Sequence, residues 1–488
     1  MKSVRKLVIV GGGTAGWITA SWFSRRWGKI MDVTIIDKSQ PERVGVGEAT
    51  LLSFPTVMQN MGYRVEDWIN SIDATYKAGI LFPGWGKEDN TVWHPFGFTS
   101  VGKEQIPMYD LWSNYQDQYD IKDISPLFRS SQAGKIEIDY VRDTYAYQID
   151  CGKLVRFLQQ SNPCNYIKSD VKRVVKNGDD IEKLVLDDGS EIVGDLYIDC
   201  TGWKQLLGND DNIDLTDRLF IDTALAGRVK YKSDKEQHPY TDCRALEHGW
   251  RWAIPTRSRI GTGYCFNRSI TDPDVVADAF VKHWDNRISK DELKLLDWKP
   301  QRVKHFWKGN LVSIGLSAGF IEPLESTGLA LMIRGIEYLE ESMYGCVYNP
   351  NYEPEVFNIR MKVAFESAVD YITMHYTYSQ RKGEFWDYVR QNIKKPGMQE
   401  YMENQINDPY SVTFQNDRTS SFFGGSNWHV WLLQIMPEVV PKQYWHSLSP
   451  DLVPRFEKYL NTLNQSVLDA TPQKILLKEW YGQKNCMV

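Results

Sequence analysis

Apolar and polar positions near the N-terminus follow an order typical of a β-strand, a tight turn and an α-helix. Residues 7–10 (LVIV) are apolar and mostly β-branched, which favours a buried strand. Residues 17–23 (WITASWF) carry apolar side chains at helical spacing, and residues 33–36 (VTII) again favour a strand. The pattern predicts a βαβ unit whose first turn is rich in glycine.

The turn between the first strand and the helix fills the pattern G-x-G-x-x-G with Gly11, Gly13 and Gly16. In such a loop the first glycine permits the turn, the second lets a pyrophosphate approach the backbone, and the third lets the helix pack closely. Thr14 and Ala15 open the helix, whose free N–H groups and partial positive charge favour phosphate. These features predict a dinucleotide site.

Asp37 follows the second strand, where an acidic side chain binds a ribose hydroxyl in such units. The loop by itself leaves open whether the dinucleotide is NAD or FAD. A glycine-rich turn without a chemical role is the alternative interpretation. The order of strand, loop, helix, strand and acid favours the dinucleotide.

Apolar spacing further along the chain predicts helices and strands in a mixed order. Helices are expected near residues 51–61, over 66–80, over 153–160 with Asp150 as the N-cap, over 329–343 and near 355–378. Strands are expected over 171–176, 181–186, 196–199 and 310–315, and residues 218–270 alternate as in an antiparallel sheet. The fold class predicted is α/β, with a Rossmann-like module, an antiparallel sheet insertion and an appended helical region.

The dinucleotide-binding module is therefore expected to be discontinuous in sequence. We assign it residues 1–85, 150–217 and 300–345. The inserted segments are then residues 86–149 and 218–299. Residues 346–488 form the mainly helical C-terminal region.

Composition limits the partners of the chain. Its 488 residues are 42% hydrophobic and 25% charged, and its formal net charge is −6. Because nucleic acids and membrane surfaces demand clustered Lys and Arg, we expect neither as a partner. No apolar run approaches the ~20 residues needed to cross a bilayer. We expect a soluble, cytoplasmic protein, and a homo-oligomer is compatible with this composition.

Cysteine spacing and aromatic content bear on the chemistry. The 7 cysteines form no C-x-x-C pair and no finger-like spacing with His, so we expect unmodified thiols in a reducing compartment and no metal site.

The chain contains 18 Trp and 26 Tyr. Large aromatic side chains fill cores and line apolar pockets, so this content favours a flat, apolar substrate.

Several motifs in sequence order resemble those of the flavin-dependent halogenases, the family of the tryptophan halogenases, and the resemblance spans essentially the whole chain. The most specific motif is Gly249-Trp250-x-Trp252-x-Ile254-Pro255. The others are the glycine loop at residues 11–16, Val46-Gly47-Glu48-Ala49-Thr50, a lone Lys77, Ile198-Asp199-Cys200-Thr201-Gly202, Glu322-Pro323-Leu324-Glu325-Ser326-Thr327-Gly328, His375-Tyr376 and Phe385-Trp386.

The resemblance implies FAD, used as FADH2 that a separate NAD(P)H-dependent flavin reductase supplies. It also implies that dioxygen and a halide ion yield hypohalous acid, which passes to a second chamber and halogenates an electron-rich aromatic carbon. The dinucleotide module is then an FAD-binding module of the flavin monooxygenase type, and the C-terminal region covers the substrate chamber. The cofactor-binding residues implied are Gly11, Gly13, Thr14, Ala15, Gly16, Asp37, Val46, Gly47, Glu48, Ala49, Val171, Gly315 and Leu324.

The catalytic residues implied by the resemblance are Lys77, Glu325 and Ser326. The Lys77 nitrogen can polarise hypohalous acid by a hydrogen bond or react to a haloamine. Glu325 can orient the acid with Lys77, stabilise the cationic ring intermediate or take its proton, and Ser326 can hydrogen-bond along the halide path. The alternative interpretations are a solvated helix lysine and a surface or capping carboxylate. Glu322, in the same motif, is expected to be structural.

Halide and substrate positions follow from the same resemblance. Thr327 and Gly328 precede the helix expected from Leu329, and a helix N-terminus favours an anion such as halide. An ordinary helix cap is the alternative.

Four aromatic or imidazole side chains are expected on the substrate side. His94 and Phe96 match a His-Pro-Phe element that flanks the aromatic substrate, with a core histidine as the alternative for His94. Trp250 and Trp252 should share one face of a strand and form a wall that keeps the substrate from the flavin. Core packing is their alternative.

The C-terminal region departs from the tryptophan-specific halogenases, because residues 422–437 lack a recognisable Tyr-Tyr, Glu and Trp clamp. The expected substrate is therefore an indole, a phenol or a similar small arene rather than free tryptophan in particular. A flavin monooxygenase that hydroxylates and a catalytically silent FAD-binding protein are the alternative functions. The first usually carries Gly-Asp where Gly315 is followed by Leu316, and the second would have lost Lys77 or Glu325.

Overall fold

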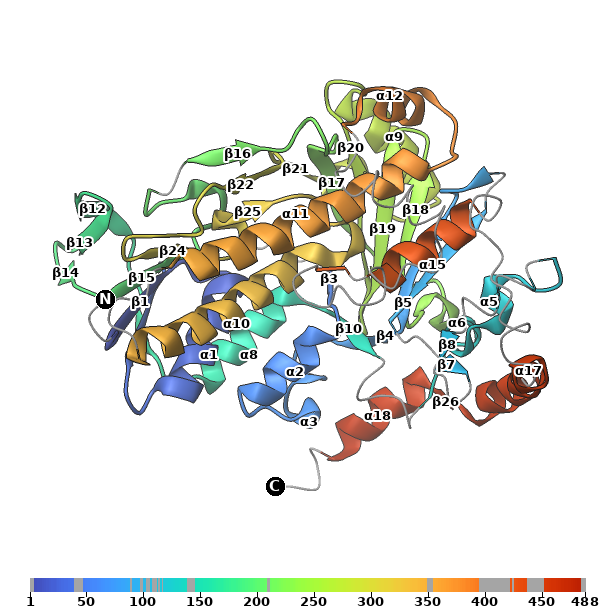
Figure 1. The fold of residues 1–488 in the computed structure, drawn as a ribbon, viewed down its shortest axis with the longest axis horizontal. Helices are drawn as coiled ribbons and strands as arrows, with labels where there is room; N and C mark the ends of the chain where they lie inside the picture. The colour runs from blue at the N-terminus through green and yellow to red at the C-terminus, as the bar shows by residue number, and fades with distance from the viewer. Residues whose placement is uncertain are drawn as a thin grey trace.

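The computed structural model describes most of the chain, and Figure 1 shows its architecture. The described residues are 4–38, 47–87, 90–96, 100–101, 106–107, 112, 115, 117–137, 145–208, 211–348, 354–394, 422–423, 425–436 and 452–483. Two large sheets lie at opposite ends of the view in Figure 1, and the long helices α10 and α11 run between them.

A six-stranded sheet forms the N-terminal layer, in the order β11-β2-β1-β15-β24-β23. Its first five strands are parallel, and β23 is antiparallel to β24. The strands are β1 (Lys6–Val10), β2 (Asp32–Ile36), β11 (Asn165–Ile167), β15 (Leu196–Asp199), β23 (Trp307–Lys308) and β24 (Leu311–Ser313). Parallel strands end at one common edge, which is where α/β sheets bind ligands.

The two faces of this sheet are covered by different layers. Leu7 and Ile9 of β1 join the main core, which includes Trp17 of α1 (Thr14–Trp27). Val8 and Val10 point the other way and pack in a separate cluster with the small sheet of β12 (Val171–Asn177), β13 (Asp180–Leu186) and β14 (Glu191–Ile192). This alternation is the period of two expected of a strand that is buried on both sides.

A seven-stranded sheet forms the second layer, in the order β21-β17-β20-β19-β18-β5-β6. Its pairs are antiparallel except β18 with β5, which are parallel. The strands are β5 (Gly79–Pro83), β6 (Thr91–Pro95), β17 (Thr223–Val229), β18 (Thr241–Leu246), β19 (Gly249–Pro255), β20 (Ile260–Phe266) and β21 (Lys294–Asp297). Strands from residues 79–95 and 223–297 thus share one sheet.

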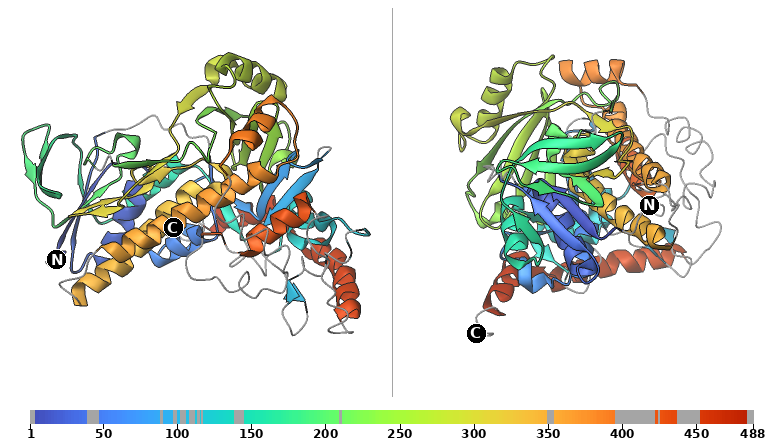
Figure 2. Two further views of the ribbon diagram at one scale, coloured as in Figure 1. Left: turned by 45° about the horizontal axis from the view of Figure 1, so that its top comes forward. Right: turned by 90° about the vertical axis from the view of Figure 1, so that its left-hand side faces the viewer.

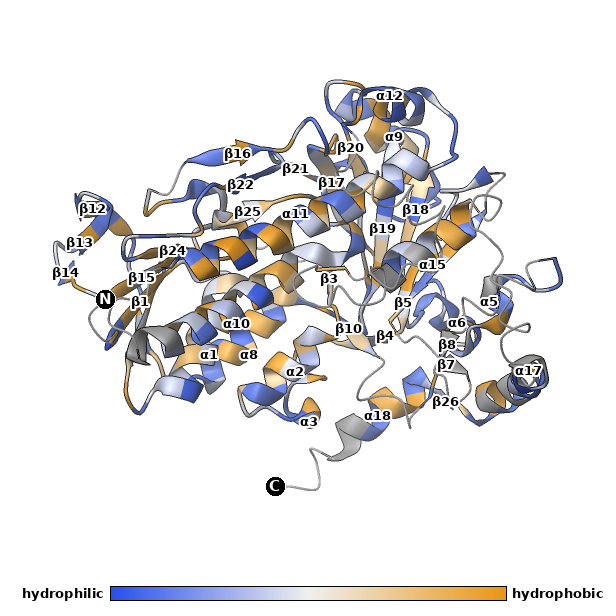
Figure 3. Ribbon diagram, in the orientation of Figure 1, coloured by the Kyte–Doolittle hydropathy of each residue, from blue (hydrophilic) through white to orange (hydrophobic). Residues whose placement is uncertain are grey.

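Helices connect and cover the two sheets. Figure 2 shows α10 and α11 lying side by side along the molecule, and their residues are in contact. Apolar residues, orange in Figure 3, recur along α1 and α10. The described helices outside the 3-10 turns are α1, α2 (Ser53–Asn60), α3 (Val65–Trp68), α5 (Ile121–Ile124), α6 (Pro126–Gln132), α8 (Cys151–Ser161), α9 (Pro273–His283), α10 (Thr327–Tyr348), α11 (Glu355–Tyr378), α12 (Glu384–Asn392), α15 (Gly425–Ile435), α17 (Leu452–Asp469) and α18 (Gln473–Gln483).

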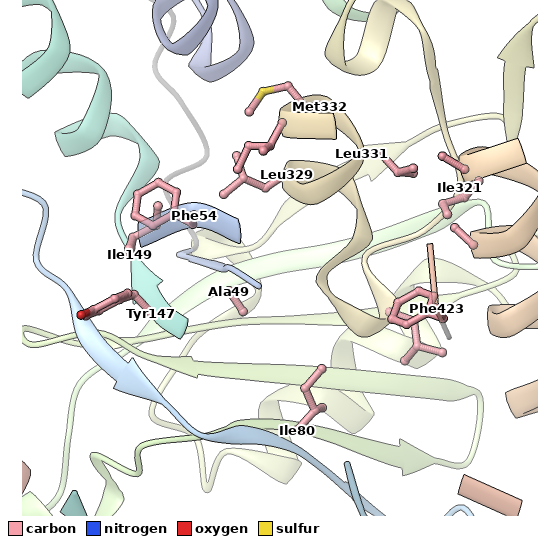
Figure 4. Packing of buried hydrophobic residues seen from close by; sticks show 14 of the residues in the cluster. Ala49, Phe54, Ile80, Tyr147, Ile149, Ile321, Leu329, Leu331, Met332 and Phe423 are labelled. Atoms are coloured by element: carbon pink, nitrogen blue, oxygen red, sulfur yellow. The ribbon is translucent and has the colours of Figure 1, made fainter. Parts of the chain in front are cut away.

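Buried apolar side chains of several elements form one cluster, part of which Figure 4 shows from close by. Phe54 of α2 and Leu329 of α10 belong to this cluster, together with Tyr147 of β10 (Ala146–Ile149), Ala49 of β3 (Glu48–Ala49) and Ile80 of β5. One continuous core therefore joins the segment after the glycine loop to the first turn of α10. The candidate catalytic residues Lys77 and Glu325 are buried and directly follow the core residues Tyr76 and Leu324.

Most of the expected elements are confirmed, including the N-terminal βαβ unit, α11 and the antiparallel sheet. Asp150 caps α8 by accepting a hydrogen bond from the Lys153 amide. The helix expected over residues 66–80 is wrong. Only Val65–Trp68 are helical there, and residues 75–77 form β4 (Thr75–Lys77), which is followed by β5. Pairing of β4 with β10 and of β5 with β18 satisfies this backbone and outweighs its helical periodicity.

The described helices include none that combines the length and the apolar character required to span a membrane. The cysteines whose state is described, Cys151, Cys164, Cys200, Cys243 and Cys265, are free thiols.

Candidate active site

The glycine loop has the geometry of a phosphate-binding turn. Gly11 has φ +110°, and a Cβ atom there would lie 2.4 Å from the carbonyl oxygen of Cys200. A Cβ on Gly16 would lie 1.8 Å from the Gly11 carbonyl oxygen, so the helix and the turn touch at this point. Around Gly13, in contrast, no described atom lies within 4 Å of such a Cβ. The structure therefore leaves room where a pyrophosphate would approach the backbone.

Asp37 and Gly315 lie against the same loop. A Cβ on Gly12 would lie 2.0 Å from the Asp37 carboxylate, and Asp37 is buried at the end of β2. Gly315 has φ +74°, and a Cβ there would lie 2.7 Å from the Ala15 Cβ. Gly13, the N-cap of α1, makes no side-chain capping bond. The loop, the helix N-terminus and the acid thus fit the phosphates and ribose of a dinucleotide, the class to which the expected FAD belongs.

The remaining expected cofactor residues lie on different elements of the fold. Gly47 has φ +80°, and a Cβ there would lie 3.3 Å from the Ile254 side chain of β19. Glu48 and Ala49 form β3, which pairs with β10. Leu324 is fully buried in the main core. Val171 packs with the cluster on the other face of the six-stranded sheet. Val46 lies outside the described residues.

Lys77 is fully buried, so the interpretation as a solvated helix lysine is wrong. Its Nζ donates hydrogen bonds to the Thr50 carbonyl oxygen at 3.0 Å and to the Ser326 hydroxyl at 2.8 Å. It also lies 4.8 Å from the centroid of the Phe96 ring. Both of these hydrogen-bond partners are uncharged, and burial lowers the pKa of Lys77 to about 7. At neutral pH a large share of Lys77 is therefore the free amine.

Glu325 is buried as well, which contradicts the interpretation as a surface carboxylate. His94 Nδ1 lies 2.8 Å and 3.0 Å from its two carboxylate oxygens, and His375 Nε2 lies 2.8 Å from Oε1. Burial opposes ionisation, but the charge of His94 and hydrogen bonds from both imidazoles outweigh it and lower the pKa of Glu325 to about 2. Glu325 is thus a carboxylate across the physiological pH range.

The backbone that carries these groups is strained. Glu325 and Ser326 both have φ 59°, in the left-handed region that non-glycine residues rarely adopt. Each such residue costs about 1–3 kcal/mol and persists only where its surroundings determine it. Here the Glu325 carboxylate is fixed by two histidines and the Ser326 hydroxyl is fixed by Lys77. The left-handed backbone thus directs the Glu325 side chain toward the histidines and the Ser326 side chain toward Lys77.

The first turn of α10 lies beside this loop. The helix begins at Thr327, two residues earlier than expected, and the Thr327 hydroxyl donates to the Glu322 carbonyl oxygen at 3.1 Å. Gly328 is exposed and lines a small pocket together with Gly315 and Met332. Gly328, one of the two expected halide residues, thus lines the same pocket as Gly315, an expected cofactor residue.

Trp250 and Trp252 lie on one face of β19, as expected, with ring centroids 6.2 Å apart. Trp252 lies over Gly263 of β20, where a Cβ would come within 2.1 Å of the indole. Trp250 Nε1 donates to the Tyr376 hydroxyl at 2.9 Å. The pair therefore forms a continuous aromatic wall, compatible both with core packing and with a barrier beside the flavin.

Glu322 occupies an environment opposite to that of Glu325. The Tyr376 hydroxyl donates to its Oε1 at 2.7 Å, and its Oε2 is buried without a described partner. Burial raises the pKa of Glu322 to about 8. Two carboxyl groups of one motif are thus held in opposite protonation states at neutral pH.

The sequence motifs include His375 and Thr50 but assign neither residue a contact in the site. Thr50 ends the Val46–Thr50 motif and accepts from Lys77 through its backbone, which no residue type reveals. His375 belongs to the His375-Tyr376 motif, so its position was visible but its contact with Glu325 was not. Among the described side chains, no cluster of His, Cys, Asp and Glu is arranged to hold a metal ion.

Comparisons with known proteins identify the family of the chain. The tryptophan halogenase family model matches residues 6–449. The chain is 27% identical to tryptophan 7-halogenase RebH of Lentzea aerocolonigenes, over 91% of this chain and 92% of that protein. It is 29% identical to tryptophan 6-halogenase SttH of Streptomyces toxytricini, over 78% of this chain and 80% of that protein.

Solved structures show the same similarity in three dimensions. The flavin-dependent halogenase Xcc4156 of Xanthomonas campestris has a TM-score of 0.87 and 26% identity, over 98% of this chain and 99% of that chain. The tryptophan halogenase of Shewanella frigidimarina has a TM-score of 0.86 at 24% identity, covering 98% of each chain, and so supports the fold alone. Since the family model matches most of its length, the chain belongs to the tryptophan halogenase family.

Proposed function

We propose that this chain is a flavin-dependent halogenase that acts on a small electron-rich arene of the indole or phenol type. One observation carries the proposal: the fully buried Lys77 bonds to Ser326, next to Glu325, and lies beside the Phe96 ring. This amine is buried and partly uncharged. It is a suitable acceptor for an electrophilic halogen.

The glycine loop, Asp37 and Gly315 hold FAD in this proposal. Together with dioxygen and halide, bound reduced FAD would supply the hypohalous acid that the site uses. A separate NAD(P)H-dependent flavin reductase provides FADH2. Thr327 and Gly328 are proposed to adjoin the halide, because helix N-termini favour anions.

Lys77 then accepts the halogen. The free amine attacks the halogen of hypohalous acid, the N–X bond forms and the O–X bond breaks. The departing hydroxide takes a proton from the amine and leaves as water. The arene carbon next attacks the halogen and the N–X bond breaks, after which the ring proton is lost and returns the amine.

The other side chains of the proposed site position the arene and keep it away from the flavin. Glu325 faces the cationic ring intermediate as a permanent carboxylate, because its pKa is about 2. Phe96 offers a ring face for stacking, and His94 orients Glu325. Trp250 and Trp252 separate the arene from the flavin, which disfavours direct hydroxylation.

A product screen tests this function. The chain is supplied with FAD, a flavin reductase, its nicotinamide, oxygen, and chloride, bromide or iodide in turn, against a panel of indoles, phenols and free tryptophan. We expect arene products whose mass follows the halide supplied. Hydroxylated products with every halide would instead assign a monooxygenase, and FAD binding without any product would assign a silent binding protein.

A further inference from the structure

Two glutamine side chains of the C-terminal region bond to the backbone of strands that carry the site. Gln434 lies on α15 and Gln473 begins α18, and both side chains are buried. Their partners, Trp93 and Tyr76, stand 341 and 397 residues earlier in the chain. Each partner directly precedes a proposed site residue. The two contacts therefore link distant parts of the chain at the site.

Gln434 pairs with both backbone groups of Trp93. The Trp93 amide donates to Gln434 Oε1 at 2.8 Å, and Gln434 Nε2 donates to the Trp93 carbonyl oxygen at 2.8 Å. Because β6 is the last strand of the seven-stranded sheet, the glutamine amide takes the place of a neighbouring strand there. Buried backbone groups need such partners. The residue before His94 is thus fixed at both of its polar groups.

The same helix also reaches His94 itself. Asn427 and Gln434 lie seven positions apart on α15, a spacing that places them on one face of the helix. Asn427 Oδ1 lies 2.9 Å from His94 Nε2, while the other ring nitrogen of His94 contacts Glu325. The helix α15 therefore binds β6 at two successive residues, and the imidazole is held on both sides.

Gln473 makes the corresponding contact with β4, the last strand of the sheet β3-β10-β4. Its Oε1 accepts from the Tyr76 amide at 2.9 Å, and its Nε2 donates to the Gln237 carbonyl oxygen at 3.1 Å. Its own backbone amide donates to the Gly134 carbonyl oxygen at 2.9 Å. The residue before Lys77 is thus tied to the segment before β18.

The chain uses the same kind of pairing away from the site. The Trp307 amide of β23 donates to Asn358 Oδ1 at 2.8 Å, and Asn358 Nδ2 donates to the Trp307 carbonyl oxygen at 2.9 Å. Asn358 lies in the first turn of the 24-residue helix α11, whereas His375 lies in its last turn. This pair offers a chemically matched control.

We propose that Gln434 and Gln473 are positioning residues of the halogenation site, because they fix the strands that carry the imidazole and the amine beside Glu325. This inference rests on the proposed function. The imidazole and the amine come from different sheets, so a shift of β6 against β4 would change their relative position. A misplacement of about 1 Å can slow a reaction about 100-fold.

Gln473→Met tests the contact with β4. The substitution keeps the length of the side chain and removes both of its hydrogen bonds. Lys77 binds the halogen and not the arene in the proposed mechanism. We therefore expect kcat for arene halogenation to fall about 10-fold while the KM for the arene stays within about twofold. Flavin reoxidation should continue at the rate of the unaltered chain.

Gln434→Met tests the contact with β6, which carries His94 and leads to Phe96 on the proposed arene side. This variant should lower kcat about 10-fold and also raise the KM for the arene about threefold. A general loss of stability gives no such difference between the two variants. Where a methionine variant does not fold, Gln434→Glu or Gln473→Glu replaces it and should show the same difference, because glutamate keeps the acceptor and loses the N–H donors.

Asn358→Leu breaks the equivalent pairing at Trp307 and is the control. It should lower the thermal stability but leave kcat and KM within about twofold of the unaltered chain. A kcat within about twofold of the unaltered chain in either glutamine variant would overturn the proposal. An equal loss of kcat in Asn358→Leu would also overturn it.

Hydrogen exchange tests both contacts without flavin, halide or arene. The Trp93 amide should exchange at least about 10-fold faster in Gln434→Met, and the Tyr76 amide should do so in Gln473→Met. Unchanged exchange in either variant would overturn the proposal. If the unaltered chain halogenates no arene, the proposed function fails, whereas the exchange rates still show whether the two glutamines hold the strands.

Discussion

The Nζ atom of Lys77 donates a 2.8 Å hydrogen bond to the hydroxyl of Ser326, which ties strand β4 to the strained loop before α10. The neighbouring Glu325 carboxylate forms its hydrogen bonds with His94 and His375 instead. The lysine is thereby buried beside a carboxylate without being paired to it. Burial lowers the pKa of Lys77, whereas the charge of His94 and hydrogen bonds from both histidines lower the pKa of Glu325.

Two glycines of the N-terminal loop should respond differently to the same substitution. Gly13→Val should fold normally, because no described atom lies near the added Cβ, but should bind FAD at least about 10-fold more weakly. Gly16→Val should destabilise the fold, because its Cβ would lie 1.8 Å from the Gly11 carbonyl oxygen. Flavin fluorescence titration and thermal unfolding distinguish the two effects. Unchanged FAD affinity in Gly13→Val would contradict the cofactor site.

Glu322 should make stability fall with rising pH. Its pKa is about 8 in the folded chain and near 4.3 when unfolded, so the folded state holds a proton that the unfolded state releases. The free energy of unfolding should therefore decrease between about pH 5 and pH 8 relative to Glu322→Gln, which cannot ionise. Urea unfolding at pH 5.5, 7 and 8.5 measures this difference. A difference that is independent of pH would show that Glu322 is not buried as a neutral acid.

Glu325→Gln should preserve the fold and lose activity. The amide oxygen can still accept from one histidine, but the negative charge that faces the ring intermediate is gone, and we expect about 100-fold slower halogenation. Flavin reoxidation should continue at its usual rate. Glu384→Gln, an exposed acid on α12, is the matched control. Halogenation within twofold of the unaltered chain would remove Glu325 from the chemistry.

The sequence predicted the βαβ unit well because its signals are local. Gly11 needs its positive φ, and the apolar strands around it follow a simple period. Periodicity predicts a helix at Lys77 because its segment carries apolar residues at helical spacing. The strands β4 and β5 are instead fixed by pairing with β10 and β18, more than 60 residues away in the chain. Pairing over such a distance leaves no local signal.

The candidate site was only partly visible for the same reason. Motif resemblance placed Lys77, Glu325 and His94 in one site, and the structure brings them together. His375 contacts a carbonyl of its own helix and a carboxylate 50 residues away, and Thr50 contributes a backbone atom. The opposite environments of Glu322 and Glu325 likewise arise from tertiary neighbours.

The most direct test of the account is Lys77→Met, with arene products and flavin reoxidation measured in the same reaction. The variant keeps an apolar chain of similar length but has no nitrogen to accept a halogen. We expect halogenated product to fall below detection while flavin reoxidation continues, and Lys282→Met, at an exposed position on α9, to behave like the unaltered chain. Arene halogenation retained by Lys77→Met would contradict the central claim that this buried amine carries the halogen.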